Sequence, residues 1–410
     1  MIDTNLLKKY AHTLLVDGLN LQKGQALLIN VDVDSKDFAV IVTEEAYALG
    51  AKDVILNWRH TPITRQRLLH ADQSVLENPA DWIPVYYRGI VDDKAAVLSL
   101  ISANPKALAG IPAERISMQS RNLNKALSFY HTEIMSSGLT WCVASVATPL
   151  WADLLGYTGT EEEKVDALWN EIFTLCRIAN VDEDQTITAH LARLKERTEA
   201  LNKLNLKSLH YTCPNGTDLT IQLPEGHIWQ GGAEASKDGI IFNANIPTEE
   251  VFTAPQYNGA NGVVHSTKPL IYQGNPIEDL SLTFESGKIV DYKATVGQEV
   301  LKELVETDEG SHYLGEVALV DHYSPISQSN KIFYETLFDE NASCHLAIGA
   351  AYPTCLKDSD GLSEEELKEK GLNHSLTHVD FMVGHEKMNI MGITQDGQEV
   401  AIMIDGRLQV

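Results

Sequence analysis

The chain is poor in cysteine and in basic residues. Its 410 residues include five cysteines, which are scattered and show no CxxC spacing. A disulfide framework and a cysteine-based zinc site are therefore not expected. The 32 lysine and arginine residues face 57 aspartate and glutamate residues, which gives a formal net charge of -25. Because such a surface repels phosphate and anionic lipid, we expect no nucleic-acid partner and no membrane partner.

Long apolar runs are also missing. No segment approaches the roughly 18–20 apolar residues that are needed to span a bilayer. The first residues do not form a basic segment followed by an apolar one, so we expect no signal peptide. With unpaired cysteines, these absences predict a cytoplasmic location. The composition, 44% hydrophobic and 22% charged, is typical of a folded globular protein.

Several motifs of common enzyme classes are absent. The chain has no GxGxxG after a predicted strand, no GxxxxGK[ST] and no GxSxG, so nucleotide binding and serine hydrolysis lose their usual support. There is no HExxH either, because Lys387-Met388-Asn389 follows His385-Glu386. A thermolysin-like zinc helix is therefore not expected.

The first half alternates buried strands with helices. We expect strands at residues 26–31, 53–58, 95–101 and 139–146, and helices at residues 37–49, 64–76, 123–136, 161–178 and 187–204. This alternation predicts an α/β domain with a mostly parallel sheet. Because single cores stop growing near about 250–300 residues, we expect two domains, with the first covering residues 1–207.

The second half, residues 208–410, reads as a β-rich α+β domain. Short alternating segments are separated by turn signals such as Asn215-Gly216 and Asp396-Gly397. We expect strands at residues 209–213, 218–223, 262–265, 280–284, 288–294, 316–320, 378–383 and 399–404, and helices at residues 298–307, 331–338 and 364–370.

The residues that can do chemistry concentrate in this second half. His378 and Asp380 are two positions apart in a predicted strand, so their side chains lie on the same face. An imidazole beside a carboxylate is a good ligand pair for Zn²⁺, Co²⁺ or Mn²⁺. An isolated HxD is nevertheless more often an ordinary surface pair.

Three further residues are each ambiguous on their own. His345 sits among small and apolar residues, where a core hydrogen bond competes with a metal as its partner. Glu316 opens an apolar strand directly after a glycine, which also suits a solvated strand end. Glu250 lies in a segment between two prolines that reads as a loop or an edge strand. Together with His378 and Asp380, these residues could hold two metal ions with one shared carboxylate.

Four linked motifs resemble the thermophilic aminopeptidase family, peptidase family M29, which includes aminopeptidases T and S. They are PTEEVFTAP at 247–255, GEVALVD at 315–321, ENASCHLAIGAAYP at 340–353 and HVDFMVG at 378–384. The resemblance extends over nearly the whole chain, including the NGTDL turn at 215–219.

The resemblance implies a metalloaminopeptidase that holds two divalent cations (Zn, Co, Mn or Mg) and acts on short peptides with a free N-terminus. It also implies a homodimer. The implied ligands match Glu250, Glu316, His345, His378 and Asp380, with Glu316 as the bridging carboxylate. Glu340 matches the family's catalytic base and Tyr352 its transition-state stabiliser.

Two other functions fit the residues without the resemblance. One is a different two-metal hydrolase, such as an amidohydrolase or a phosphoesterase. The absence of a phosphate-binding glycine loop argues mildly against phosphate substrates. The other is a non-catalytic binding module, whose histidines and carboxylates would be ordinary surface and core groups.

Overall fold

The structure is a computed structural model that describes residues 2–179, 182–272, 275–359 and 361–410. The chain forms two compact units, which interleave along the sequence. The first unit comprises Met1–His190, Ala233–Pro247 and Ile332–Leu337. The second comprises Leu191–Gly232, Thr248–Lys331 and Phe338–Val410. The domain boundary expected at residue 207 remains a prediction.

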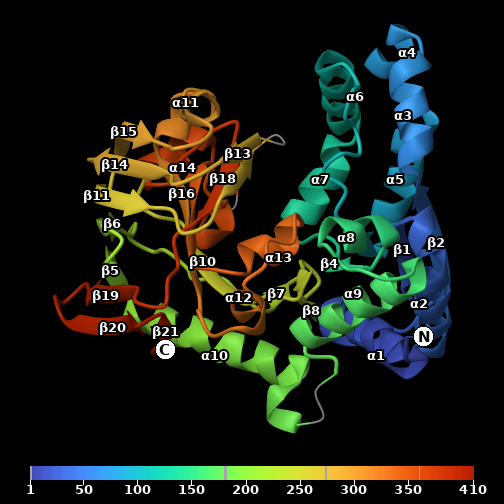
Figure 1. Ribbon diagram of the computed structural model, residues 1–410, viewed down its shortest axis with the longest axis horizontal. Helices are drawn as coiled ribbons and strands as arrows, with labels where there is room; N and C mark the ends of the chain where they lie inside the picture. Colours follow the sequence, from blue (N-terminus) through green and yellow to red (C-terminus); the bar gives the residue numbers. More distant parts are fainter. Residues whose placement is uncertain (1, 180–181, 273–274, 360) are drawn as a thin grey trace. The chain divides into compact units, whose positions relative to one another are not determined.

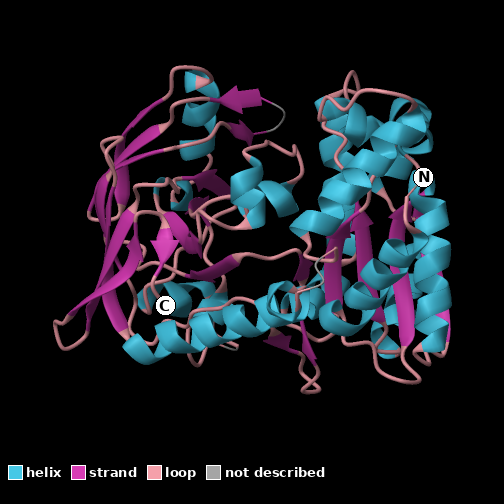
Figure 2. Ribbon diagram, turned by 60° about the horizontal axis from the view of Figure 1, so that its bottom comes forward, coloured by secondary structure: helices cyan, strands magenta, loops and turns pink. Residues whose placement is uncertain are grey.

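A parallel sheet forms the centre of the first unit (Figures 1 and 2). Its strands lie in the order β2-β1-β3-β4-β9, and every pair in it is parallel. The strands are β1 (Ala26–Asp32), β2 (Asp53–Arg59), β3 (Ala96–Ile101), β4 (Trp141–Ser145) and β9 (Asn245–Ile246). The mostly parallel sheet that the alternation predicts is confirmed. The short strands β7 (Glu234–Ala235) and β8 (Ile241–Phe242) form a separate antiparallel pair.

Helices surround this sheet (Figure 2). They are α1 (Thr4–Thr13), α2 (Lys36–Ala48), α3 (Thr61–His70), α4 (Gln73–Glu77), α5 (Trp82–Asp92), α6 (Ala113–Ala126), α7 (Ser128–Met135), α8 (Pro149–Leu154) and α9 (Glu161–Leu175). Both faces of the sheet must be covered, because a parallel sheet buries both. Among the described residues, no helix is long and apolar enough to cross a membrane.

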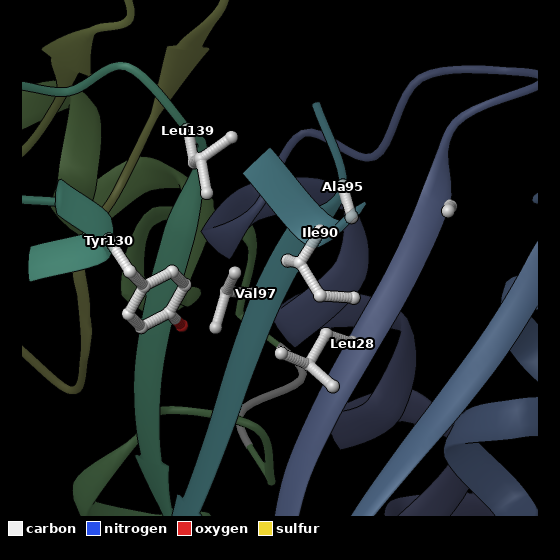
Figure 3. Close-up of a cluster of buried hydrophobic side chains, with 7 residues drawn as sticks. Leu28, Ile90, Ala95, Val97, Tyr130 and Leu139 are labelled. Carbon is white, nitrogen blue, oxygen red and sulfur yellow. The ribbon is translucent and has the colours of Figure 1, made fainter. Parts of the chain in front are cut away.

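One apolar cluster shows how α5 and α7 cover a face of this sheet (Figure 3). Leu28 of β1 and Val97 of β3 pack with Ile90 of α5, Tyr130 of α7 and Leu139. The alternate residues of β1 are buried too, so they serve the opposite face. Because both faces of the strand are buried, its sequence is a continuous apolar run such as ALLINV. Runs of this kind predict the strands.

Several helices in the first unit depart from the predicted pattern. The expected helix at 123–136 begins earlier and divides into α6 and α7. The side chains of α6 are mostly polar, although its few apolar residues follow the helical period. Helices α1, α5 and α8 have no predicted counterpart, and α5 exposes Trp82 and Val85 although both are large and apolar.

Within its described residues, the second unit contains two antiparallel sheets of four or more strands, besides a short antiparallel pair formed by residues 270–272 and 275–277. The larger has the order β15-β14-β11-β6-β5-β19-β20-β21. Its strands are β5 (Leu206–Thr212), β6 (Asp218–Gln222), β11 (Ala260–His265), β14 (Ser281–Glu285), β15 (Lys288–Lys293), β19 (Asn389–Thr394), β20 (Glu399–Ile404) and β21 (Arg407–Leu408). The smaller has the order β10-β16-β17-β18. Its strands are β10 (Glu250–Thr253), β16 (Leu314–Val320), β17 (His345–Gly349) and β18 (His378–Met382).

The remaining elements are the long helix α10 (Ile187–Leu204), which was expected at these residues, and several short elements of the second half. The short elements are β12 (Leu270–Tyr272), β13 (Asn275–Ile277), α11 (Gln298–Val305), α12 (Pro325–Ser329), α13 (Thr336–Glu340) and α14 (Glu364–Glu369). The helix expected at 331–338 begins later, because α13 starts at Thr336 and extends to Glu340, and α12 ends before the expected range. Ser324 caps α12 by accepting a hydrogen bond from the backbone N–H of Ser327.

Candidate metal centre

The four-stranded sheet of the second unit has two unlike faces. In an antiparallel sheet, residues that pair across strands point to the same side, and residues i and i+2 do as well. One face therefore carries a row of buried apolar side chains, which come from all four strands. They include Val251, Val317, Leu346 and Phe381. This apolar face anchors the sheet in the core of its unit.

The opposite face gathers all five predicted ligands. Glu250 pairs with Val320, Glu316 with Ala347, Ala347 with Asp380, and His378 with Gly349. His345 pairs with Ala318, and Ala318 lies two residues from Glu316 and two residues from Val320 in β16. The ligands thus alternate with small residues, which leaves space above the sheet between them.

Two glycines let the strands approach closely at this site. A β-bulge occurs between Leu314 and Glu316. A Cβ on Gly315 would lie 2.1 Å from the carbonyl oxygen of Ala350, so only glycine fits here. Gly349 has a φ of 112°, and a Cβ there would lie 2.1 Å from the carbonyl oxygen of Thr377. The glycine before Glu316 is thus required by the packing that places its carboxylate.

The ligands form two groups that share Glu316. Glu250, Glu316 and His345 offer ligand atoms within 4.8 Å of one another, and so do Glu316, His378 and Asp380. Oε1 of Glu316 lies 3.3 Å from Nε2 of His345, whereas its Oε2 lies 3.5 Å from Nε2 of His378. Each oxygen of one carboxylate therefore faces a different histidine. We call the first group the inner group and the second the outer group.

Backbone carbonyls orient both histidines. Nδ1 of His345 lies 3.0 Å from the carbonyl oxygen of Ser343, and Nδ1 of His378 lies 2.7 Å from that of Ala350. Because a carbonyl can only accept, each Nδ1 carries the proton and donates it. This leaves each Nε2 directed at the carboxylates, as in many metal sites.

The electrostatics of the two groups demand a cation. Burial alone would lower the pKa of His345, but the carboxylates of Glu250 and Glu316 outweigh it and raise this pKa well above its ordinary value. Burial likewise opposes the charge on His378, yet Asp380 and Glu316 raise its pKa to about 9. The pKa of Glu316 is raised, first by burial and then by the charges of Asp380 and Glu250. A proton or a metal ion must therefore balance these carboxylates.

The donor set fits a divalent metal. Oε2 of Glu250 and Oδ1 of Asp380 are buried and receive no well-aligned hydrogen bond, although each lies near a histidine Nε2, at 3.1 and 3.4 Å. Buried polar atoms without partners are rare and ask for an explanation. Imidazole nitrogens mixed with carboxylate oxygens suit Zn²⁺, Co²⁺ and Mn²⁺.

Glu340 lies beside both groups. It is the last residue of α13, and its pKa is raised well above the ordinary value, first by burial and then by the charges of Glu250 and Asp380. A carboxyl whose pKa is raised takes up a proton more readily than an ordinary one, which favours a general base that later returns the proton. Glu340 is thus placed to act as an acid or a base next to the ligands.

Tyr352 lies on the side of the outer group. Its ring centroid is 4.9 Å from that of His378 and 6.2 Å from that of Phe252, which is on the same sheet face as Glu250. Burial, together with the charges of Glu316 and Asp380, raises the pKa of Tyr352. The phenol therefore stays protonated at neutral pH and can donate a hydrogen bond.

The structure thus brings together every residue that the sequence analysis singled out. Glu250 and Glu316 depart from their solvated alternatives, because both are buried, whereas the burial of His345 fits both of its alternatives. The sequence analysis missed the two carbonyls that orient the histidines and the aromatic contact of Phe252. The glycine before Glu316 was the available signal for the close approach of the strands.

Comparisons with known proteins agree with this geometry. The family model described as Thermophilic metalloprotease (M29) matches residues 3–408. The chain belongs to the M29 family. Aminopeptidase AmpS of Bacillus subtilis is 46% identical over 400 residues, which cover 98% of this chain and 97% of that protein. Aminopeptidase T of Thermus aquaticus is 38% identical over 407 residues, 98% of each chain.

Solved structures show the same relationship. Wild-type AmpT from Thermus thermophilus superposes with a TM-score of 0.90 at 36% identity, over 99% of this chain and 100% of that one. A 2,5-dihydroxypyridine dioxygenase from Pseudomonas putida shares the fold alone, with a TM-score of 0.52 at 12% identity. The resemblance seen in the sequence is confirmed, and this M29 chain is a hydrolase of the aminopeptidase class. Family membership also implies a divalent metal and peptide substrates.

Proposed function

We propose that the protein is an aminopeptidase that uses two divalent cations to release N-terminal residues from short peptides. The observation that carries the proposal is the position of Glu316, whose two oxygens face two separate histidine groups. One ion would be held by Glu250, Glu316 and His345, and the other by Glu316, His378 and Asp380. Glu316 would bridge them.

The bound cations would supply Lewis-acid chemistry, which acidifies a water molecule and polarises the substrate carbonyl. Glu340 takes the proton of the attacking water, because its pKa is raised by burial and by neighbouring carboxylates. It then passes this proton to the leaving amine. Tyr352 stays protonated and donates a hydrogen bond to the developing oxyanion.

The acidic side chains around the site would also recognise the substrate. The charged amino terminus of a peptide would bind near an acidic side chain of the site or, as the free amine, near a metal ion. A blocked N-terminus carries no such charge. The preference for short peptides, a homodimer and a cytoplasmic location are further parts of the proposal, and they derive from the family resemblance and the composition.

The experiment compares free and N-acetylated forms of one dipeptide, with chelated protein resupplied in turn with Zn²⁺, Co²⁺, Mn²⁺ and Mg²⁺. We expect no activity after chelation, recovery with at least one cation, and cleavage of the free dipeptide only. A phosphate monoester serves as the control substrate. Equal cleavage of both dipeptides, or full activity after chelation, would contradict the proposal.

A further inference from the structure

The loop after β17 is linked to two side chains of the site, those of His378 and Tyr352. Ala350 provides the carbonyl that accepts the Nδ1 proton of His378, and Tyr352 follows two residues later. The direction of the His378 ring therefore depends on where this loop holds the Ala350 carbonyl. The other histidine is oriented elsewhere, by the Ser343 carbonyl at the opposite end of β17.

Asn373 fixes the residues on both sides of Ala350. Its side chain is buried, and its Nδ2 donates to the carbonyl oxygen of Gly349 at 2.6 Å. Its own backbone carbonyl accepts a hydrogen bond from the N–H of Ala351 at 2.9 Å. Residue Ala350 is therefore held between two hydrogen bonds to the same asparagine.

The second donor of the Asn373 amide ties this loop to another segment. Nδ2 also donates to the carbonyl oxygen of Gly310 at 2.8 Å. A primary amide has two N–H donors on one nitrogen, which matches two carbonyl acceptors. A carboxylate of the same shape has no donor and would face both carbonyls with negative charge.

The surroundings of Asn373 are themselves fixed. The Asp308 carboxylate accepts hydrogen bonds from the backbone N–H of Ser311 at 2.8 Å and of Leu376 at 2.6 Å. It also accepts one from the hydroxyl of Ser375 at 2.8 Å. The residues that follow Asn373 and the segment next to Gly310 are therefore held by Asp308, and they cannot adjust freely when the amide is lost.

We propose that Asn373 is a positioning residue of the metal centre, which sets the orientation of His378 through the Ala350 carbonyl. The inference deepens the proposed function, since it assigns Asn373 to the outer group alone. Outer-sphere partners of metal-bound histidines typically contribute about 10–100-fold to metal affinity. His345 does not depend on Asn373, because the Ser343 carbonyl orients it.

In the first test, metal-free protein is titrated with Co²⁺, and the binding of each ion is measured by calorimetry. Asn373→Ala should weaken one of the two binding steps by at least about tenfold and leave the other within about threefold. Asn389→Ala is the matched control, because the Asn389 side chain also hydrogen-bonds the backbone, with its Oδ1 accepting from the N–H of Asp405, but it lies in the eight-stranded sheet. We expect both steps to be unchanged in the control. Equal weakening of both steps by Asn373→Ala, or of neither, would overturn the inference.

The second test reads the histidines directly in the metal-free protein by NMR. The Nδ1–H proton of His378 should exchange at least about tenfold faster in Asn373→Ala, while that of His345 serves as the internal reference and stays unchanged. If the alanine variant does not fold, Asn373→Ser keeps one donor and should show a smaller effect in the same direction. A His378 proton that exchanges alike in all variants would overturn the inference. Wild-type protein that binds fewer than two ions would instead overturn the proposed function, and the NMR result would still decide the role of Asn373.

Discussion

The inner and outer ligand groups differ in their exposure. All three members of the inner group, Glu250, Glu316 and His345, are buried, whereas His378 and Asp380 of the outer group are half-buried. The proposed base Glu340 is half-buried as well, and the ring of Tyr352 packs at a tilt against that of the outer histidine, His378. On the proposed function, this difference predicts a division of roles, in which the inner group would hold an ion firmly and the outer group would face the substrate.

The largest expected effect on metal binding and activity comes from replacing Glu316, the residue that the two groups share. Glu316→Ala should remove both ions and reduce kcat/KM by about 10³-fold or more, as expected for a group on which a whole catalytic unit depends. Glu285→Ala, an exposed glutamate at the end of β14, is the control. An active Glu316→Ala enzyme that keeps both ions, measured by metal analysis and dipeptide cleavage, would remove the basis of the comparison.

Glu340→Gln should separate proton transfer from metal binding. We expect kcat to fall by about 10²–10⁴-fold, because a general base is lost while both ions stay bound. Metal analysis beside steady-state kinetics makes the measurement. A loss of one ion in Glu340→Gln would show that Glu340 is itself a ligand, and would show which group it belongs to.

Replacing one histidine at a time sharpens the comparison directly. His378→Ala should lower the affinity for one ion by more than about 100-fold and leave the other ion bound. This loss exceeds the usual cost of losing an outer-sphere partner. His345→Ala should weaken both, because it leaves the buried carboxylates of Glu250 and Glu316 without their neighbouring imidazole. The two variants are compared by calorimetry with the same cation. Identical losses would mean that the groups do not act separately.

The smallest expected effect, about tenfold for each pH unit, is a pH dependence of binding of the outer ion. A metal binds the neutral imidazole, and the pKa of His378 is raised to about 9 by Asp380 and Glu316 against the opposing effect of burial. Below this pH each ion must displace a proton. Affinity should therefore rise about tenfold per pH unit up to about pH 9 and level off above it. An affinity for the outer ion that is flat between pH 6 and 9, measured in His345→Ala and in the wild type, would contradict this.

Local sequence patterns predict part of this molecule well. The buried strands β1 and β3 are continuous apolar runs, and the HxD of β18 places two ligands on one face whatever the surroundings are. Helix α6 is mostly polar, so only a few apolar residues mark its helical period. The separation of β16 from β17 by two short helices likewise depends on packing that the sequence does not display.

The assembly of the site depends on pairing between distant segments. Glu250 reaches His345 only because β10 pairs with β16 and β16 with β17, and a shift of one residue would send either side chain to the apolar face. Single residues such as Glu316 cannot reveal that register. The linked motifs of the M29 family predicted these residues together, because a family resemblance carries the register that local patterns lack.

The central claim is that Glu316 joins two ions into one catalytic centre. The most direct test titrates metal-free wild-type protein with a single cation while following bound metal and cleavage of a free dipeptide in the same samples. We expect two ions per chain and activity that rises with the second ion, which fills the outer group. Full activity with one ion per chain, and no further change when a second binds, would contradict the account.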